Sequence, residues 1–334
     1  MFNFWPLSKI LEASKRRIFL DYASATPVLP EVLKVMKKYW SKDFYNPNAI
    51  YEEGVMVRKE VEECRTKIAR IFGVAPESVI FTSGGTEANT LAVRGVKQGK
   101  VIFDEESHLS VSDAIIENKS KEIVLVSSIT TDNKLGRQIR EERKKKNSSY
   151  PLLHIDASQT ALYYDMSLER LACDMLTLDS AKLYGPKGIV ALVIRKGVKL
   201  DLPPRGTPAV DLIVGLTKAL EIAVSDRALE FKRLDKLTSD FAELIRNNLP
   251  QVEVNKISPN IVNVSVSNIL PEFLVLKLDH AGVMVSAGPA CNSNKPVAHG
   301  VHGMDSVPVR FSFGKFTTEK EIKTATETLI KICK

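Results

Sequence analysis

The fold is decided by the segment Val79-Ile-Phe-Thr-Ser-Gly-Gly-Thr-Glu-Ala-Asn-Thr90. An apolar run of strand length leads into two glycines, and a helix-compatible segment follows them. Free backbone N–H groups at the start of such a helix converge on one spot, and Thr86 adds a hydroxyl there. This arrangement suits a phosphate group. The segment matches neither the dinucleotide-binding pattern nor the Walker loop, so a plain strand–helix turn is the alternative interpretation.

Similar apolar, β-branched runs recur through the first two thirds of the chain. They cover residues 101–103, 123–126, 152–155, 175–178 and 189–194. Because helix-compatible stretches separate the first of them, the pattern predicts a mostly parallel sheet with helices on both faces. After residue 228 we expect a charged helix over 228–248, a strand over 261–266, a helix over 272–280 and a capping box at Thr318-x-x-Glu321. The sequence therefore predicts a large α/β domain over residues 18–228 and a smaller C-terminal α+β domain over residues 229–334 with residues 1–17.

The composition is that of an ordinary globular protein. The chain has 334 residues, of which 44% are hydrophobic and 26% are charged, with 47 basic and 40 acidic side chains. These values exclude a disordered or collagen-like chain. No apolar run approaches the roughly 20 residues that cross a bilayer, and the N-terminus lacks the order of a signal peptide. We expect a soluble, cytoplasmic protein without membrane contact.

One dense basic run, Arg143-Lys144-Lys145-Lys146, bears on possible partners. We interpret it as the solvated end of a helix, where cations complement the helix dipole. A contact with tRNA or with an acidic partner is the alternative. No recognition helix or zinc-finger pattern accompanies the run, so we expect no direct nucleic-acid binding.

The four cysteines contain no Cys-x-x-Cys pair, so the sequence predicts neither a metal site nor a disulfide framework. Cys64, Cys173 and Cys333 lie in apolar or helical surroundings and are predicted to be core or helix residues. Cys291 alone stands in a polar loop, over residues 288–296. It is the candidate reactive thiol.

Two further polar residues follow predicted strands. Asp156 ends one apolar run, and Lys182 follows another within Asp179–Gly188. Ligands of α/β sheets lie beyond the carboxyl ends of strands, and partial desolvation of an amine favours the neutral form that a Schiff base requires. Taken singly, each residue has an alternative interpretation: Asp156 as a cap of the next segment, and Lys182 as a side chain that extends from a strand end to solvent. Together with the phosphate cradle, they are the parts that a pyridoxal 5'-phosphate (PLP) site requires.

At this point the chain resembles a known family, the cysteine desulfurases of the class V aminotransferase group. Nine motifs stand in the order typical of that family: Leu20–Pro27, Asn46–Tyr51, Thr82–Glu87, His108, Asn133, His154–Gln159, Lys182–Gly188, Ala290-Cys291 and Val309–Thr318. The resemblance implies the architecture of a fold-type I PLP-dependent transferase. It also implies PLP as the cofactor and L-cysteine as the substrate.

The resemblance implies a role for each site residue. Lys182 would bind PLP as a Schiff base and move the substrate α-proton, Asp156 would pair with the pyridinium nitrogen, and His108 would stack on the ring. Gly85 and Thr86 would hold the phosphate, while Gln159 would contact the phenolic oxygen. Thr207 would reach the phosphate of the partner subunit, which would make a homodimer the active unit.

Arg310 and Asn133 would bind the substrate carboxylate, again by resemblance. The sequence around Arg310 supports this independently, because residues 307, 309, 311 and 313 are apolar and leave Arg310 and Ser312 on the other face of a strand. A guanidinium group there can bind a carboxylate with two parallel hydrogen bonds. A surface arginine on an edge strand is the alternative.

The chain departs from the family pattern at several positions. Asp179 and Ala181 stand where a serine and a histidine are usual, so we expect Asp179 to turn away from the phosphate or Ser180 to bind it instead. Tyr51 stands where a histidine is common. Only 18 residues, 292 to 309, separate Cys291 from Arg310. This loop is shorter than usual, so we expect sulfur transfer to distant acceptors to need a docking partner.

The leading hypothesis is a desulfurase that converts L-cysteine to L-alanine and leaves a persulfide on Cys291. A sulfur-acceptor protein, either a scaffold for iron–sulfur clusters or a tRNA-thiolation enzyme, would then take the sulfur. A selenocysteine lyase, or another class V lyase or aminotransferase, is the first alternative. A degenerate, non-catalytic PLP-binding scaffold is the second, and it is suggested by Asp179 and Ala181.

Overall fold

The computed structural model describes residues 17–104, 107–115, 120–201, 206–267, 269–288 and 307–334. These residues form two compact units, which we describe separately. Unit 2 covers Thr26–Ala228, and unit 1 combines the described residues up to Ala25 with Leu229–Lys334. The first boundary differs from the expected one at residue 17, because β1 (Ile18–Phe19) pairs in parallel with β10 (Val283–Met284) of unit 1.

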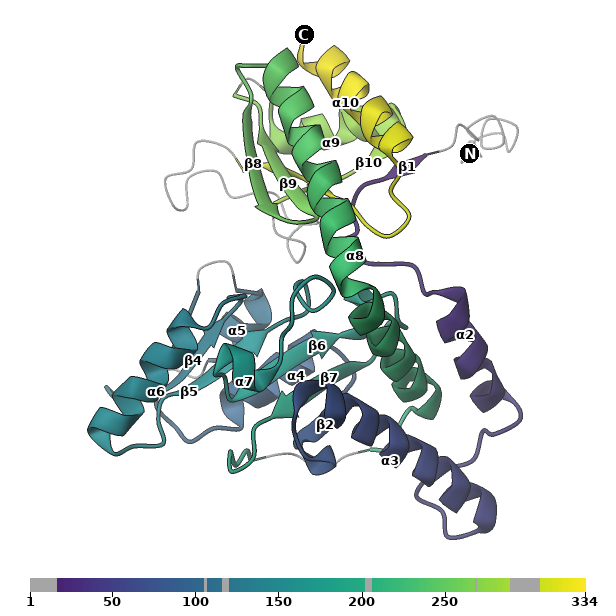
Figure 1. The fold of residues 1–334 in the computed structure, drawn as a ribbon, viewed down its shortest axis with the longest axis vertical. Coiled ribbons are helices and arrows are strands. Elements are labelled where there is room, and N and C mark those ends of the chain that lie inside the picture. Colours follow the sequence, from purple (N-terminus) through teal and green to yellow (C-terminus); the bar gives the residue numbers. More distant parts are fainter. Residues whose placement is uncertain (1–16, 105–106, 116–119, 202–205, 268, 289–306) are drawn as a thin grey trace, which may run out of the picture. The chain divides into compact units, whose positions relative to one another are not determined.

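Unit 2 is built on a six-stranded sheet with the order β2-β7-β6-β5-β4-β3 (Figure 1). Its strands are β2 (Val79–Thr82), β3 (Lys100–Phe103), β4 (Ile123–Ser128), β5 (Leu152–Asp156), β6 (Met175–Asp179) and β7 (Val190–Ile194). All six predicted strands are confirmed within two residues at each end. Strands β3 to β6 are parallel, while β7 runs antiparallel to both of its neighbours. The sheet is therefore mixed but mostly parallel.

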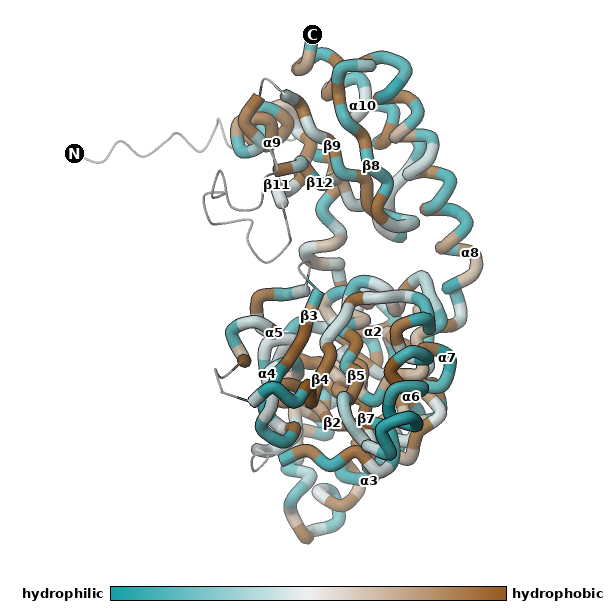
Figure 2. The backbone as a smooth tube through the Cα atoms, turned by 90° about the vertical axis from the view of Figure 1, so that its left-hand side faces the viewer, coloured by the Kyte–Doolittle hydropathy of each residue, from teal (hydrophilic) through white to brown (hydrophobic). Residues whose placement is uncertain are grey.

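Helices connect these strands. They are α2 (Pro30–Met36), α3 (Glu52–Phe72), α4 (Gly85–Arg94), α5 (Leu109–Ala114), α6 (Lys134–Lys146), α7 (Leu168–Leu171) and the first part of α8 (Val210–Asn248), with the 3-10 helices η1 (Lys37–Trp40), η2 (Pro76–Ser78) and η3 (Ser180–Lys182). The central strands are apolar on both faces, and β7 is buried throughout. Figure 2 shows β4 and β5 as hydrophobic and α6 as mostly hydrophilic. Because helices cover both faces of the sheet, the strand sequences are continuous apolar runs and do not alternate between apolar and polar residues.

Arg143, the first residue of the basic run, is buried and not solvated. Its guanidinium group binds both carboxylate oxygens of Asp174, and its Nε donates to the carbonyl oxygen of Pro151 at 2.6 Å. Arg195 Nε donates to the same carboxylate at 2.7 Å, and Asp174 is fully buried. The interpretation of the run as a solvated helix end is therefore wrong for Arg143. It holds for the exposed residues 144–146.

Burial also sets the state of the cysteines. Cys64 and Cys173 are buried, as predicted, and Cys333 is half-buried near the end of α10. Burial raises the pKa of Cys64 and Cys333, and it raises the pKa of Cys173 to about 12. Cys291 lies outside the described residues. The three described thiols are thus poorly suited to form a thiolate.

Unit 1 has a four-stranded antiparallel sheet with the order β11-β12-β9-β8. Its elements are β8 (Glu253–Ser258), β9 (Ile261–Ser265), β11 (Ser286–Ala287), β12 (Val309–Ser312), α9 (Pro271–His280), α10 (Glu319–Cys333) and the second part of α8. The rings of Phe241, Phe311 and Phe313 pack together, with centroids 5.0 and 5.2 Å apart, and form the aromatic part of the core. In the described ranges of both units, no helix combines the length and apolarity that a bilayer crossing requires.

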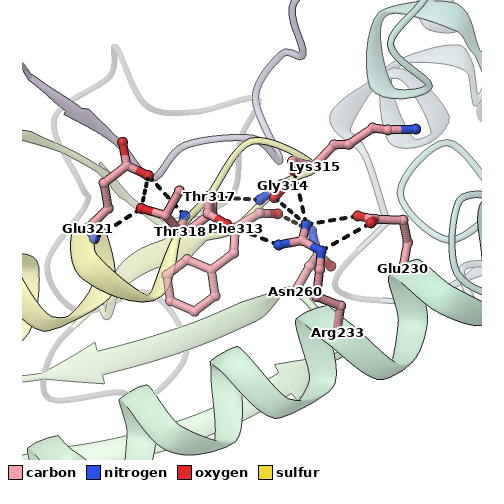
Figure 3. Close-up of polar contacts among 9 residues, drawn as sticks. All are labelled: Glu230, Arg233, Asn260, Phe313, Gly314, Lys315, Thr317, Thr318 and Glu321. Carbon is pink, nitrogen blue, oxygen red and sulfur yellow. Dashed lines mark hydrogen bonds and ion pairs between the residues drawn. The ribbon is translucent and has the colours of Figure 1, made fainter.

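The predicted capping box at the start of α10 is confirmed (Figure 3). Thr318 Oγ1 accepts from the backbone N–H of Glu321 at 3.2 Å, and the Glu321 carboxylate accepts from the backbone N–H of Thr318 at 2.9 Å. Arg233 of α8 pairs with Glu230 and donates to the backbone carbonyl groups of Gly314, Lys315 and Thr317. The turn before α10 is therefore fixed to α8 within unit 1.

Candidate active site

The first turn of α4 is open, as a phosphate cradle requires. Gly84 has extended backbone, and Gly85 begins the helix directly after β2. No heavy atom lies within 4 Å of the position that a Cβ would take at either glycine. Within the part of the chain that the structure describes, no group accepts a hydrogen bond from the backbone N–H of Gly85 or Thr86. These N–H groups lie at the positive end of a helix and are available to an anion.

Asp156 lies at the carboxyl end of β5, as predicted, and both of its oxygens are hydrogen-bonded. Asn89 Nδ2 of α4 donates to Oδ2 at 2.9 Å, and the backbone N–H of Ser158 donates to Oδ1 at 3.0 Å. The side chain is only partly buried. The carboxylate is therefore held in one orientation and is still open on the side beyond the strand.

His108 precedes α5 and caps it. Its Nδ1 accepts from the backbone N–H of Ser110 at 3.0 Å and lies 2.7 Å from Ser110 Oγ. Asn89 Nδ2 lies 3.0 Å from the same Oγ, so Asn89 and Ser110 connect His108 to Asp156. The sequence analysis missed both connecting residues. The available signal was a single asparagine on the apolar face of the helix after the glycines, four residues beyond Gly85.

Lys182 ends η3, directly after β6, and is partly buried. Asp179 caps this short helix, since its Oδ1 accepts from the backbone N–H of Ala181 at 2.9 Å. Burial raises the pKa of Asp179, while the hydrogen bond from the backbone N–H of Ala181 and the positive charge of Lys182 oppose that rise and the negative charge of Asp156 adds to it. The charges of the predicted lysine and carboxylate thus both act on Asp179, and Asn89 and Ser110 link the predicted histidine to the same carboxylate.

Ser180 lies in the interior instead. It is fully buried, and a Cβ at Gly185 would overlap its Oγ. This Oγ has no hydrogen-bond partner among the described residues. The expected contact of Ser180 with a phosphate gains no support from this position.

The remaining predicted contacts of unit 2 lie at its surface or partly below it. Gln159 is partly buried three residues after Asp156, and Thr207 is exposed. Asn133 immediately precedes α6, and its side chain does not cap that helix. The amide of Asn133 is therefore not committed to the helix end.

Arg310 lies in β12 of unit 1 and is 7% exposed. Its Nη2 donates to Asp21 Oδ1 and to Ser24 Oγ, both at 2.9 Å, and its Nη1 donates to the carbonyl oxygen of Gly288 at 3.3 Å. Its Nε is buried and has no partner among the described residues. The guanidinium group is therefore held in one orientation, and one of its faces already pairs with a carboxylate. Asp21 was quoted within a family motif, but its role as the partner of Arg310 was not predicted.

Sequence comparison gives the class to which this site belongs. The profile of the aminotransferase class-V family matches residues 18–122, 101–205 and 204–324. The chain therefore belongs to the class V aminotransferase family, whose enzymes use PLP. The residues present fit this cofactor, since unit 2 supplies an open helix start for the phosphate, a carboxylate for the ring nitrogen and a lysine for the aldehyde.

Individual relatives narrow the class to the cysteine desulfurases. The chain is 31% identical over 373 residues to the cysteine desulfurase IscS of Dictyoglomus turgidum, with 95% of each chain covered. It is 32% identical over 327 residues to the cysteine desulfurase IscS 1 of Archaeoglobus fulgidus, with 82% of this chain and 84% of that protein covered. The protein is thus an enzyme of the cysteine desulfurase group.

Solved structures show the same fold. A NifS-like protein superposes with a TM-score of 0.82 at 24% identity, and the match covers 95% of this chain and 99% of that one. The apo structure of a cysteine desulfurase from Thermococcus onnurineus superposes with a TM-score of 0.74 at 18% identity, over 100% and 99% of the two chains. The predicted fold-type I architecture is confirmed.

Proposed function

We propose that the enzyme removes the sulfur of L-cysteine, releases L-alanine and keeps the sulfur as a persulfide on Cys291. The observation that carries the proposal is the placement of Lys182 directly after β6 and of Asp156 at the end of the neighbouring strand β5, with Asn89 and Ser110 linking Asp156 to His108. The reaction balances without an external oxidant or reductant. The substrate C–S bond breaks, the sulfur joins the thiolate of Cys291, and the electron pair left on carbon takes up a proton.

Each of the site residues of unit 2 has its own role in the proposed reaction. PLP, when bound, supplies a ring that accepts electron density from the substrate α-carbon. The amine of Lys182 binds the cofactor and then moves the proton at the α-carbon, while the carboxylate of Asp156 holds a proton on the ring nitrogen. The ring of His108 covers one face of the site. Gly85 and Thr86 bind the phosphate through their backbone N–H groups.

Arg310 and Asn133 bind the carboxylate of L-cysteine in this proposal. Arg310 is suited to this role because its guanidinium group is nearly buried and fixed by Asp21. Desolvation strengthens the attraction between a guanidinium group and a carboxylate. Asn133 adds an amide that does not cap α6.

We also propose that the active unit is a homodimer in which Thr207 completes the phosphate site of the partner subunit. Residues 40–56 of unit 2 carry several large apolar side chains that are exposed in the single chain: Trp40 (58%), Phe44 (66%), Ile50 (94%), Tyr51 (50%) and Met56 (46%). Exposed large apolar side chains gathered in one segment are typical of an association surface. Sedimentation velocity should give the mass of a dimer, and Ile50→Asp should shift the protein toward the monomer and weaken PLP binding. A fully active monomer would refute this assembly.

The sulfur then passes to an acceptor protein, either an iron–sulfur scaffold or a tRNA-thiolation enzyme. The described cysteines are all free thiols, which supports a reducing compartment such as the cytoplasm. A pull-down with candidate acceptors after loading with ³⁵S-labelled cysteine distinguishes the two routes, because only the true acceptor takes up the label.

One experiment tests the chemistry. Purified enzyme is loaded with PLP and incubated with L-cysteine, and alanine and protein-bound persulfide are measured. Lys182→Ala should lose the covalent linkage of PLP and all turnover. Cys291→Ser should keep the bound cofactor and the spectral response to L-cysteine, yet form no persulfide and almost no alanine.

Cys64→Ser is the control, because Cys64 is buried in α3 and should leave the chemistry intact. If Cys291→Ser releases alanine as fast as the wild type, the desulfurase proposal fails and the lyase alternative takes its place. If the wild type binds PLP but forms no alanine, the chain is a non-catalytic scaffold.

A further inference from the structure

We propose that Asn89 and Ser110 are positioning residues, which together orient Asp156 and hold the neutral ring of His108 as its Nε2–H tautomer. The consequence for turnover rests on the proposed function. The hydrogen-bond arrangement itself does not.

The two residues lie below the site and not at its surface. Asn89 is 1% exposed and Ser110 is 3% exposed, whereas Asp156 is partly buried and His108 is exposed. Asn89 comes from α4, Ser110 from α5 and Asp156 from β5. Asn89 and Ser110 thus form a buried polar link between three elements, and the link ends at two residues that reach the site.

The direction of each hydrogen bond follows from the chemistry of the groups. An ionised carboxylate only accepts hydrogen bonds, so the Asn89 atom that lies 2.9 Å from Asp156 Oδ2 must be the Nδ2 amide nitrogen. The same Nδ2 lies 3.0 Å from Ser110 Oγ and donates its second hydrogen there. The hydroxyl of Ser110 therefore has its own proton left to donate.

That proton goes to His108. Ser110 Oγ lies 2.7 Å from His108 Nδ1, and the backbone N–H of Ser110 donates to the same nitrogen at 3.0 Å. Two donors directed at Nδ1 require a lone pair on it, so the proton of the neutral imidazole must lie on Nε2. The exposed edge of the ring consequently presents an N–H donor to whatever binds at the site.

The remaining atom of the amide shows why both links matter. Asn89 Oδ1 is buried and has no hydrogen-bond partner among the described residues. The amide is therefore oriented only by the bonds of its Nδ2 to Asp156 and Ser110. Removal of either partner leaves the amide of Asn89 with one hydrogen bond. A substitution at Ser110 therefore also loosens the orientation of Asp156.

Two variants cut this link at different points. Ser110→Ala removes the hydroxyl between His108 and Asn89 and keeps the bond from Asn89 to Asp156. Asn89→Leu keeps the approximate volume of the side chain and removes both amide bonds. Thr217→Ala is the matched control, because Thr217 is 3% exposed and its hydroxyl donates to the carbonyl oxygen of Ile213 within α8, outside the link between His108 and Asp156.

The first measurement is the tautomer of His108 in the PLP-loaded enzyme. Long-range ¹H–¹⁵N correlations are recorded on protein labelled at its five histidines, and His108→Gln assigns the signal. We expect the Nε2–H pattern in the wild type and in Thr217→Ala, and a mixture of tautomers in Ser110→Ala and Asn89→Leu. An Nδ1–H pattern in the wild type overturns the proposal.

The second measurement is the rate of alanine formation. Each single variant should lower kcat about tenfold with KM for L-cysteine little changed, because misplacement of catalytic groups acts mainly on the chemical step. The double variant should also lose about tenfold and not about a hundredfold, since both changes break one link. Additive losses overturn the proposal.

The two measurements separate this proposal from the proposed function. If the wild type makes no alanine from L-cysteine but shows the Nε2–H pattern that the variants lose, the proposed function fails while the positioning role of Asn89 and Ser110 stands.

Discussion

Asp21 and Arg310, 289 residues apart in the chain, form a nearly buried ion pair with 2.9 Å between Oδ1 and Nη2. The other oxygen of Asp21 accepts from the hydroxyl of Ser286 at 2.8 Å, so the carboxylate is fixed from two sides. The N-terminal segment thereby orients the arginine of β12. The proposed receptor for the substrate carboxylate is set before any substrate arrives.

Asp21→Asn should therefore destabilise unit 1. The variant keeps the shape of the side chain but leaves the guanidinium group of Arg310 buried without a counter-ion, which costs about 3 kcal/mol of the free energy of unfolding. Guanidinium chloride denaturation at 25 °C measures this loss. Asp240→Asn is the control, because Asp240 pairs with Lys236 at 2.9 Å on the surface, where solvent screens the pair, and should cost far less stability than Asp21→Asn. Equal losses in the two variants would contradict the role of the Asp21–Arg310 pair.

His154 should make the stability of the enzyme depend on pH. It is fully buried between Ser127 Oγ and Thr177 Oγ1, each 2.9 Å from a ring nitrogen, and burial lowers its pKa to about 4, against the opposing charge of Asp156. The unfolded chain binds the proton near pH 6.5 and the folded chain does not, so this contribution is complete above pH 6.5 and is lost as the pH falls toward 4. The loss amounts to about 3 kcal/mol. Chemical denaturation at a series of pH values measures it.

His154→Gln provides the comparison for this pH dependence. Glutamine supplies both a donor and an acceptor to Ser127 and Thr177 but does not titrate. Whatever its absolute stability, the variant should lose less stability than the wild type between pH 6.5 and 4. Identical slopes for the two proteins would show that His154 is not the titrating group.

Alkylation should distinguish the cysteines by their surroundings. With a pKa of about 12, the thiol of Cys173 is ionised to about one part in ten thousand at pH 8, and it is also fully buried. Brief treatment of the native enzyme with iodoacetamide, followed by mass spectrometry of peptides, should show Cys291 modified first and Cys64 and Cys173 last. Modification of Cys173 at the rate of Cys291 without denaturant would be inconsistent with this assignment.

Thr318→Ala should shorten or weaken α10. The substitution removes the side-chain acceptor of the capping box, which costs about 1 kcal/mol of the free energy of unfolding. Thr324→Ala is the matched control, because the exposed Thr324 bonds only the carbonyl oxygen of Lys320 in the same helix. It should change stability by less than about 0.5 kcal/mol. A similar loss in both variants would indicate that the box does not stabilise the helix start.

The strands and the strand-end residues were predictable because their signals are local. Each strand is an apolar run, and Asp156 and Lys182 follow such runs directly. The start of α8 was placed too late, at residue 228 instead of Val210, because the change in composition at the expected domain boundary falls inside one continuous helix. Local composition does not reveal such a helix.

The partners of polar side chains could not be predicted, since tertiary packing decides them. Asn89 meets Asp156 67 residues further on, and Arg143 meets Asp174 31 residues further on. A charge run such as residues 143–146 shows only neighbours in sequence, so it gave no sign that its first member is buried. The geometry around Cys291 lies outside the described residues, and its assignment stays a prediction.

The carboxylate of Asp174 serves two guanidinium groups at once, and this sharing constrains how the chain can change over evolution. Loss of Asp174 leaves the guanidinium groups of Arg143 and Arg195 without their shared carboxylate. Loss of Arg143 leaves the fully buried carboxylate of Asp174 paired only with the partly exposed Arg195. Single substitutions at these three positions should therefore be selected against. Simultaneous replacement of all three residues by apolar residues should be tolerated, because it leaves no buried charge unpaired. The exposed lysines 144–146 should vary freely among related sequences. Among related sequences, substitutions at positions 143, 174 and 195 should accordingly occur together and not independently of one another.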